Sequence, residues 1–392
     1  MKIPQLDLKK QYNTIKNEVL PAIEKVIDEH KFILGPEVSQ LEEKISSFVN
    51  TKFAVGVASG SDALLISLMS LNVSEEDAVI TTPFTFFATA GAISRLGATP
   101  VFVDIEEETY NINPAEIEKY IDTNCEITNK GLFDNKTKKI IRGIIPVHLY
   151  GQAAEMENII HIAKKYNLWI VEDGAQALGA EYQGEKVGSI GTTGIYSFFP
   201  SKNLGGFGDG GMVVTNDEKL AEKLKVLRVH GSKPKYYHKI VGLNSRLDTI
   251  QAAILLVKLR YLDKWTEGRR KNAILYRELF NQTSLITDKN DNWNILLPVE
   301  KKYNKHVYNQ YTIRVKDRDN LQSYLQEKGI GTALYYPLPL HIQDCFKNTG
   351  YRKGDLKISE KISDEVLSIP IFPELSEAEI QYIVSSINNF YK

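Results

Sequence analysis

The 392-residue sequence has few cysteines and no long apolar segment. Its two cysteines, Cys125 and Cys345, argue against a disulfide framework and favour a reducing compartment. No apolar run approaches the length that crosses a membrane, and residues 1–7 carry charges where a signal peptide needs an apolar core. We therefore expect a cytoplasmic, soluble protein.

The sequence also lacks a strong charge of either sign. Its 48 basic and 49 acidic residues leave a net charge of −1, which provides no electrostatic reason to expect a nucleic-acid or membrane partner. Metal-ligand spacing is missing as well, because the histidines are scattered along the chain. We expect no metal site from His148, His230, His238, His306 and His341.

The first half of the chain alternates between short β-branched apolar runs and helical patterns. This alternation predicts an α/β domain with a mostly parallel central sheet covered by helices on both faces. The strands are expected at 53–58, 78–82, 100–105, 140–147 and 168–171. The helices are expected at 62–71, 86–96, 114–121 and 156–166.

The regular alternation of strands and helices ends after Asp173. Two neighbouring strands are expected at 193–199 and 212–215, followed by one long helical stretch from Arg246 to Leu279. The tail is typical of an α+β domain, with strands at 311–315 and 332–336 and helices at 321–328, 358–367 and 377–390. We expect a large domain over 21–265, a small C-terminal domain over 266–392, and a segment over 1–20 that packs with the small domain.

In a parallel sheet, ligands bind at the carboxyl ends of the strands. Three expected strands end in polar or glycine-containing loops, namely 59–61, 83–86 and 172–174. We expect these loops to contribute to a ligand site.

The chain is organised around residues 197–211, where a lysine, Lys202, lies between an aromatic strand and five glycines within seven residues. Most lysines are surface residues, and that interpretation applies here too. However, the flanking aromatics and glycines indicate a shaped cavity, and a partly desolvated lysine has a lowered pKa and can act as a Schiff-base nucleophile.

Two further features admit both a structural and a functional interpretation. Asp173, at the end of an apolar strand, could be a cap or could pair with a pyridinium nitrogen. The turn Ser59–Asp62 could be an ordinary helix cap or a phosphate site at a helix N-terminus. A phosphate site, a strand-end aspartate and a cavity lysine are together the parts that hold pyridoxal phosphate.

A dinucleotide fingerprint is matched formally by Gly206, Gly208 and Gly211. That fingerprint belongs between a strand and a helix, whereas here a strand follows. We therefore do not assign nucleotide binding to it.

Several motifs, spread over nearly the whole chain, resemble those of the DegT/DnrJ/EryC1/StrS family of pyridoxal-phosphate-dependent nucleotide-sugar aminotransferases, which have the aspartate aminotransferase (type I) fold. The motifs are Gly35-Pro36-Glu37-Val38, Ser59-Gly60-Ser61-Asp62-Ala63-Leu64, Pro146-Val147-His148-Leu149-Tyr150-Gly151, Glu172-Asp173-Gly174-Ala175-Gln176, Ser197-Phe198-Phe199-Pro200-Ser201-Lys202, Asn244-Ser245-Arg246-Leu247-Asp248 and Tyr336-Pro337-Leu338-Pro339-Leu340-His341.

The resemblance implies a role for each matching residue. Lys202 and Asp173 would be catalytic, forming the Schiff base and pairing with the pyridine nitrogen. The other residues that would bind pyridoxal phosphate are Gly60, Ser61 and Ser197 at the phosphate, Phe86 stacked on the ring, Gln176 at the ring hydroxyl, and Asn244 reaching the phosphate from a neighbouring subunit. A homodimer with shared active sites follows, and the sugar pocket would be lined by Tyr335, Tyr336, His341 and Arg246.

The resemblance also bears on the substrate. In related dehydratases a histidine replaces the lysine, so the presence of Lys202 favours transamination. The glycine run, with Asp209 in it, is similar to the corresponding segment of members that act on 3-keto sugars. We expect L-glutamate to aminate a UDP-2-acetamido-3-keto-glucose type substrate for lipopolysaccharide or another surface glycan.

Other substrates and functions remain open. The alternatives are a UDP-3-keto-uronic acid, against which Tyr335 argues because uronate-specific members commonly have histidine there, and a dTDP-3-keto-6-deoxyhexose. A same-fold sugar dehydratase is another. A non-catalytic coenzyme-binding regulator is disfavoured by the lack of a basic patch.

Overall fold

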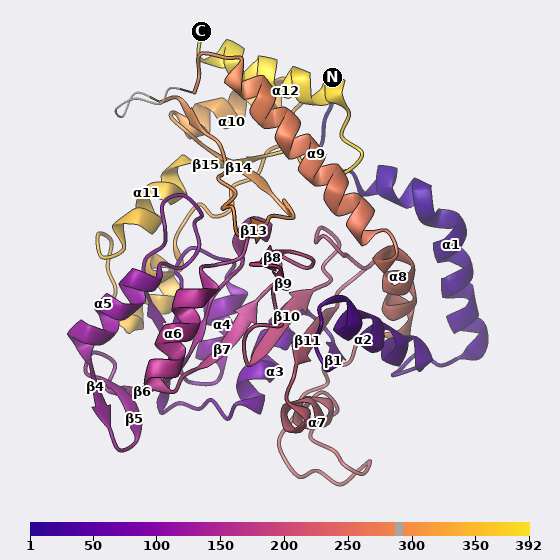
Figure 1. The fold of residues 1–392 in the computed structure, drawn as a ribbon. Coiled ribbons are helices and arrows are strands. Elements are labelled where there is room, and N and C mark those ends of the chain that lie inside the picture. Colours follow the sequence, from indigo (N-terminus) through magenta and orange to yellow (C-terminus); the bar gives the residue numbers. More distant parts are fainter. Residues whose placement is uncertain (287–292) are drawn as a thin grey trace.

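A computed structural model describes residues 1–286 and 293–392 and shows a central sheet between helical layers (Figure 1). The main strand order is β1-β11-β10-β7-β6-β2-β3. The strands are β1 (Phe53–Val57), β2 (Asp77–Thr81), β3 (Thr99–Phe102), β6 (Lys139–Ile145), β7 (Trp169–Asp173), β10 (Thr193–Ser197) and β11 (Gly211–Thr215). Pairing is parallel from β10 through β3, whereas β11 is antiparallel to both β10 and β1. The predicted α/β class is confirmed.

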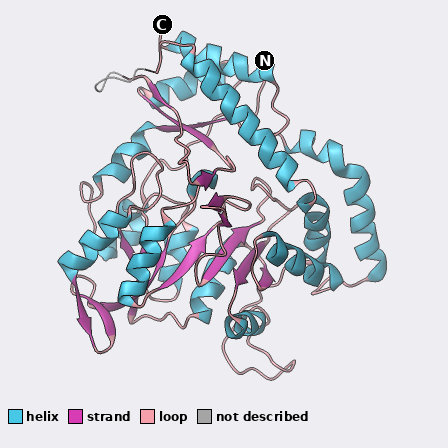
Figure 2. Cartoon of the chain, viewed as in Figure 1, coloured by secondary structure: helices cyan, strands magenta, loops and turns pink. Residues whose placement is uncertain are grey.

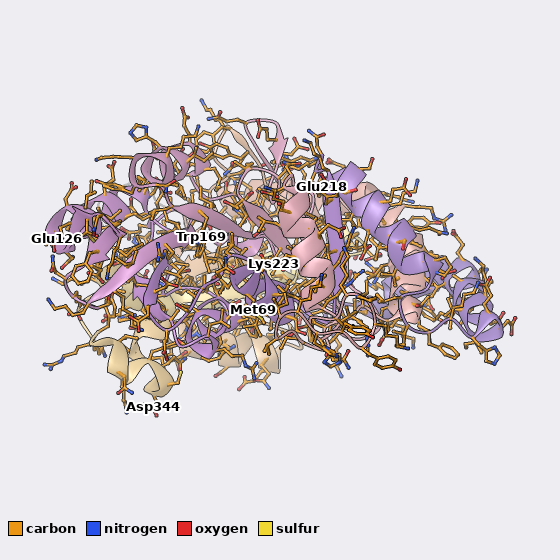
Figure 3. The ribbon with its side chains drawn as sticks, turned by 90° about the horizontal axis from the view of Figure 1, so that it is seen from below. Met69, Glu126, Trp169, Glu218, Lys223 and Asp344 are labelled. Carbon is orange, nitrogen blue, oxygen red and sulfur yellow. The ribbon has the colours of Figure 1, made fainter. Side chains whose placement is uncertain are left out.

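Helices cover both faces of the sheet because its strands are apolar on both sides (Figure 2). One face packs against α3 (Gly60–Ser70), α4 (Ala88–Arg95) and α7 (Glu218–Leu227). The other packs against α5 (Pro114–Asn124) and α6 (Met156–Tyr166). In the first layer, Lys223 of α7 donates to the Ser70 carbonyl of α3 over 2.8 Å; Lys223 and Met69 are labelled in Figure 3.

A second sheet lies at the C-terminal end of the chain, at the top of Figure 1. It has the order β12-β14-β15. A separate hydrophobic core joins this sheet to three helices. These elements are β12 (Ile295–Leu296), β14 (Tyr311–Val315), β15 (Val366–Ile369), α9 (Leu262–Asn281), α10 (Arg318–Glu327) and α12 (Glu377–Phe390).

Smaller elements complete the described chain. The hairpin β4 (Cys125–Thr128) and β5 (Gly131–Asp134) extends the main sheet beside β6. A short sheet joins β8 (Glu181–Tyr182), β9 (Glu185–Lys186) and β13 (Asn304–Lys305). The remaining α-helices are α1 (Leu8–Glu29), α2 (Pro36–Phe48), α8 (Thr249–Leu259) and α11 (Lys357–Glu365).

Three expectations about single elements are wrong. The long helix is broken near Arg260, because α8 packs on α1 and α2 whereas α9 continues into the second core. The strand expected at 332–336 forms only one bridge, from Ala333 to Ser368. The apolar residues 366–369 instead pair with β14, and α11 therefore ends before the predicted helix does.

The N-terminal segment divides its contacts between the two cores. Ile3 forms a bridge with Ile330 and is buried in the C-terminal core, while Lys10 forms a 3.0 Å ion pair with Glu379. Ile15 and its neighbours pack on α8 instead. The domain limits set out above stay a prediction.

Within the described part of the chain, no helix has the length and apolar character that a membrane span requires.

Candidate active site

The candidate site is built where β7, β10 and the start of α3 meet. Asp173 ends β7, and Ile195 of β10 lies opposite it in the parallel ladder, two residues before Ser197. Gly60 begins α3 and lies against Ser197, since a Cβ on Gly60 would be 2.6 Å from the Ser197 Cβ. This close approach requires glycine. Two of the predicted phosphate residues are thereby brought into contact.

The first turn of α3 is suited to an anion. Ser59 caps the helix by accepting the Asp62 N–H over 3.0 Å. The first amides of a helix, here at Gly60 and Ser61, have no acceptor within the helix and carry its positive dipole end. Ser61 also lines an open hollow of about 420 Å³ together with Phe86 and others. A phosphate group would fit this helix start.

Asp173 is a buried carboxylate with a fixed orientation. Its Oδ2 accepts from the Thr89 hydroxyl over 2.8 Å and its Oδ1 accepts from the Ala175 amide over 3.1 Å. Burial raises the pKa of Asp173, against the opposing effects of these two donors and of the nearby positive charge of Lys202. The two donors and the positive charge favour the ionised carboxylate, which is the form that pairs with a protonated pyridine nitrogen.

The neighbouring carboxylate has a structural function. Glu172 is fully buried and accepts backbone N–H bonds from Gly188, Ile190 and Gly191 over 2.6–2.7 Å. Its Oε2 also lies 2.9 Å from His148 Nε2. Because successive strand residues point to opposite sides, Glu172 anchors the turn behind β7 while Asp173 points into the site.

Lys202 lies in a short loop after β10. Its amide donates to the Phe199 carbonyl over 2.9 Å. Burial lowers the pKa of Lys202 to about 8, while the charge of Asp173 opposes this shift. A lysine with this pKa has a substantial unprotonated fraction near neutral pH and can act as a nucleophile.

A hydrogen-bond chain joins the large sheet to the Tyr335–Tyr336 segment. The Tyr150 amide donates to Gln176 Oε1 over 2.7 Å, and Gln176 Nε2 donates to the Tyr336 hydroxyl over 3.0 Å. The Tyr150 hydroxyl donates to the Tyr335 carbonyl. Burial and the charge of Asp173 both raise the pKa of Tyr336, so its phenol stays protonated beside the site.

Aromatic rings form one wall. The Tyr336 ring centroid lies 6.4 Å from that of Phe86 and 6.2 Å from that of Phe84. Phe84 is fully buried, whereas Phe86 is 56% exposed. Phe86 is thus available to a flat ligand, as its predicted stacking role requires.

In the described part of the chain, three predicted residues form no hydrogen bond with this cluster, although Ser245, which lies between two of them, accepts the Ala58 amide over 3.3 Å. Asn244 is exposed and its backbone bridges to Val229. Arg246 is partly exposed two positions later. His341 is buried, with its Nε2 2.9 Å from Glu360 Oε1. Their predicted roles at the phosphate or the sugar stay predictions, and the contact of His341 is with α11.

Several supporting residues were not foreseen. Thr89 orients Asp173, and Tyr150 holds both Gln176 and Tyr335. Thr89 carries no local sequence signal, whereas Tyr150 lies in the motif 146–151 but was given no role. Gln251 and Lys258 on α8 hold the glycine run, and Lys258 did have a signal, a single charge within the apolar stretch 252–259.

The residues present fit pyridoxal phosphate. An anion-binding helix start lies against Ser197 at the end of β10, and the end of β7 beside it carries a buried carboxylate whose charge acts on Lys202. For a metal ion, the residues described by the structure include no group of three or more His, Cys, Asp or Glu side chains that could hold one.

Comparison with known proteins agrees with this geometry. Residues 13–388 match the model of the DegT/DnrJ/EryC1/StrS aminotransferase family. A "pleiotropic regulatory protein" of Geobacillus stearothermophilus is 50% identical over 100% of this chain and 99% of its own. A UDP-N-acetyl-3-dehydro-α-D-glucosamine 3-aminotransferase of Acidithiobacillus ferrooxidans is 40% identical over 98% and 97%. A dTDP-3-amino-3,6-dideoxy-α-D-galactopyranose transaminase of Aneurinibacillus thermoaerophilus is 41% identical over 99% of both chains.

Solved structures agree as well. A family aminotransferase from Brucella abortus superposes with a TM-score of 0.90 at 36% identity, covering 100% of this chain and 99% of that one. The NtdA protein of Bacillus subtilis, solved with bound cofactor PMP, gives 0.86 at 29% identity, covering 98% and 84%. The chain therefore belongs to the DegT/DnrJ/EryC1/StrS aminotransferase family, and it is a pyridoxal-phosphate-dependent aminotransferase of the type I fold.

Proposed function

We propose that this enzyme transfers the amino group of L-glutamate to carbon 3 of a nucleotide-linked 3-keto sugar of the UDP-2-acetamido-3-keto-glucose type. The product would serve the synthesis of lipopolysaccharide or another surface glycan. The observation that carries the proposed chemistry is the position of the partly buried Lys202 near the buried Asp173 carboxylate, close enough for each charge to affect the pKa of the other group.

When bound, pyridoxal phosphate supplies a conjugated ring that withdraws electrons from the α-carbon of the amino donor. The unprotonated Lys202 Nζ would hold the coenzyme and afterwards take the proton from that α-carbon. Asp173 would keep the ring nitrogen protonated. Thr89 and Ala175 keep the Asp173 carboxylate in position for this contact.

The remaining coenzyme contacts would come from three directions. The helix start at Gly60 and Ser61, together with Ser197, would hold the phosphate. Gln176 would contact the ring hydroxyl while remaining oriented by Tyr150. Phe86 would stack on the ring and exclude water from one face.

The sugar preference is supported by relatives and by one residue. The Acidithiobacillus relative is named for a UDP-linked 3-dehydro sugar and the Aneurinibacillus relative for a dTDP-linked one, at nearly equal identity. Both names place the amine at carbon 3, as Asp209 does by resemblance. Tyr335 argues against a uronic acid, although Arg246 would be available to bind its carboxylate.

A homodimer with shared active sites is part of the proposal. The connection between α7 and α8 extends beyond α7 (Figure 1) and exposes large apolar side chains, with Tyr236 at 78% and Val241 at 89%. Exposed apolar groups of this size are typical of interaction sites. Asn244, in the same connection, would reach the phosphate of the partner subunit.

The test is a panel of nucleotide sugars with glutamate as donor. UDP-linked 3-keto-N-acetylglucosamine, its uronic acid, a dTDP-linked 3-keto-6-deoxyhexose and a 4-keto sugar are each incubated with the holoenzyme. Mass spectrometry of the sugar product and assay of 2-oxoglutarate follow. Preferential amination of the first substrate supports the proposal, whereas preference for the 4-keto sugar contradicts it.

Two alternatives have their own outcomes in this panel. Loss of water from the sugar without formation of 2-oxoglutarate would indicate a dehydratase. The regulatory name of the Geobacillus relative raises the possibility of a non-catalytic regulator. If the enzyme with bound coenzyme turned over none of these sugars, that result would favour the regulatory function over the one proposed.

A further inference from the structure

Helix α8 holds the glycine run that follows Lys202. Lys258 of α8 is 2% exposed, and its ammonium donates to the Gly205 carbonyl. Two helical turns earlier, Gln251 Oε1 accepts the Phe207 amide over 2.8 Å. Because residues seven apart lie on the same face of a helix, one face of α8 binds two points of the run.

The same points determine where Lys202 lies. The Lys202 loop is closed by the Gly206 amide, which donates to the Phe198 carbonyl over 2.7 Å. Gly205 packs directly on the other end of the loop, since a Cβ there would be 2.3 Å from the Pro200 carbonyl oxygen. A shift of the Gly205 carbonyl would therefore move the backbone that carries Lys202.

Burying the ammonium group of Lys258 costs more free energy than a purely structural contact requires. Its Nζ lies between two rings, 5.5 Å from the Phe207 centroid and 5.9 Å from that of Trp265. Burial lowers its pKa to about 8, and the charge of Glu374 only partly opposes this. An apolar side chain of similar length would commonly be as stable at such a position or more so.

We propose that Gln251 and Lys258 are positioning residues, which fix the glycine run so that Lys202 Nζ stays directed at the coenzyme and Asp173. This inference rests on the proposed assignment of Lys202 as the coenzyme lysine. It gives α8 a role in the reaction without contact between α8 and the substrate.

The first test compares Lys258→Met with Lys258→Arg and with a matched control, Lys223→Met. Lys223, labelled in Figure 3, is also a helix lysine that donates to a backbone carbonyl, but its partners are Ser70 and Asn72 and not the glycine run. For each variant we measure the melting temperature of the apoenzyme and the dissociation constant of pyridoxal phosphate by absorbance titration.

We expect Lys258→Met to weaken coenzyme binding by about tenfold, the loss typical of one hydrogen bond from a charged donor, without lowering the melting temperature of the apoenzyme. Lys258→Arg should recover part of the affinity, and Lys223→Met should bind as the wild type does. Unchanged coenzyme affinity in Lys258→Met, or an equal loss in Lys223→Met, would overturn the inference.

A second pair keeps the inference testable if Lys258→Met does not fold. Gln251→Glu retains an acceptor for the Phe207 amide, and Gln251→Leu removes it. We expect Gln251→Leu to bind coenzyme several-fold more weakly and to alter the pH dependence of its addition to Lys202, with Gln251→Glu closer to wild type. Equal behaviour of the two variants would contradict the positioning role.

The assignment of Lys202 is checked separately. Borohydride reduction of the wild-type holoenzyme, followed by peptide mass spectrometry, should place the coenzyme on the peptide that contains Lys202. A label on another lysine would refute that assignment. If the label is on Lys202 but the Lys258 and Gln251 variants bind coenzyme as the wild type does, only the role of α8 is refuted.

Discussion

The two halves of the candidate site are built differently. On the coenzyme side, Asp173, Gln176 and Lys202 come from one chain and are held by hydrogen bonds or burial. On the substrate side, Arg246 is partly exposed and His341 is paired with Glu360. Most of the coenzyme side is therefore held within a single chain, whereas the proposed contact of Asn244 with the phosphate needs a second one.

The largest effect should come from removing the nucleophile on the coenzyme side. Lys202→Ala is expected to lower the rate of the glutamate half-reaction by about 10⁴-fold, because no other group would transfer the proton. The absorbance change of the bound coenzyme on addition of glutamate measures this rate. Normal turnover of Lys202→Ala would show that the coenzyme side has been assigned wrongly.

The next effect concerns the carboxylate. Asp173→Asn should lower the same rate by about 100-fold or more, since an amide cannot hold the ring nitrogen protonated. Thr89→Val, which removes only one donor to Asp173, should cost less. If the two variants lost equal activity, orientation rather than charge would be the contribution of Asp173.

The pH dependence tests the environment of Lys202. Because only the free amine adds to the coenzyme, the rate at which apoenzyme binds pyridoxal phosphate should fall about tenfold per pH unit below about 8. Asp173→Asn should move this midpoint downwards, because the Asp173 charge raises the pKa of Lys202. A midpoint near 10.5, the ordinary value for lysine, would mean that Lys202 is not desolvated.

The proposed second chain can be tested by subunit exchange. Asn244→Ala should weaken coenzyme binding several-fold, the size of one lost neutral hydrogen bond. A mixture of Lys202→Ala with Asn244→Ala subunits should be more active than the two separate proteins predict, because one site of each mixed dimer is intact. Strictly additive activity, or a monomer by light scattering, would remove Asn244 from the site.

The smallest effect on activity should come from His341. Its ring is buried against Glu360, and although burial raises the pKa of Glu360, bonds from His341 and from the Gly354 and Leu356 backbone lower it overall. His341→Gln should cost about 1–2 kcal/mol of stability, as for a lost buried hydrogen bond, with little change in KM for the sugar. A large rise in KM would instead support the predicted substrate contact.

The sequence indicated some residues of the site and not others. Strand ends and glycines in the sequence indicated Asp173, Gly60 and Lys202, because carboxyl ends of parallel strands converge on one edge. Thr89 and Tyr150 could not be found in this way, since their contacts join segments 84 and 185 positions apart. The break between α8 and α9 was also missed, because both helices have continuous helical periodicity and differ only in what they pack against.

The sequence alone determined the α/β class through local periodicity and the chemical type of the site through residue types at strand ends. It indicated the family through the resemblance of its motifs. The tertiary structure decided which charged side chains face the candidate site and which are bound by the backbone. Glu172 and Asp173 are adjacent and chemically alike, yet three backbone amides bind the first while the second faces Lys202. Likewise, the single lysine in α8 gains a proposed function only because folding buries its ammonium against Gly205. Desolvation and long-range hydrogen bonds, which make these differences, arise only when distant segments pack together.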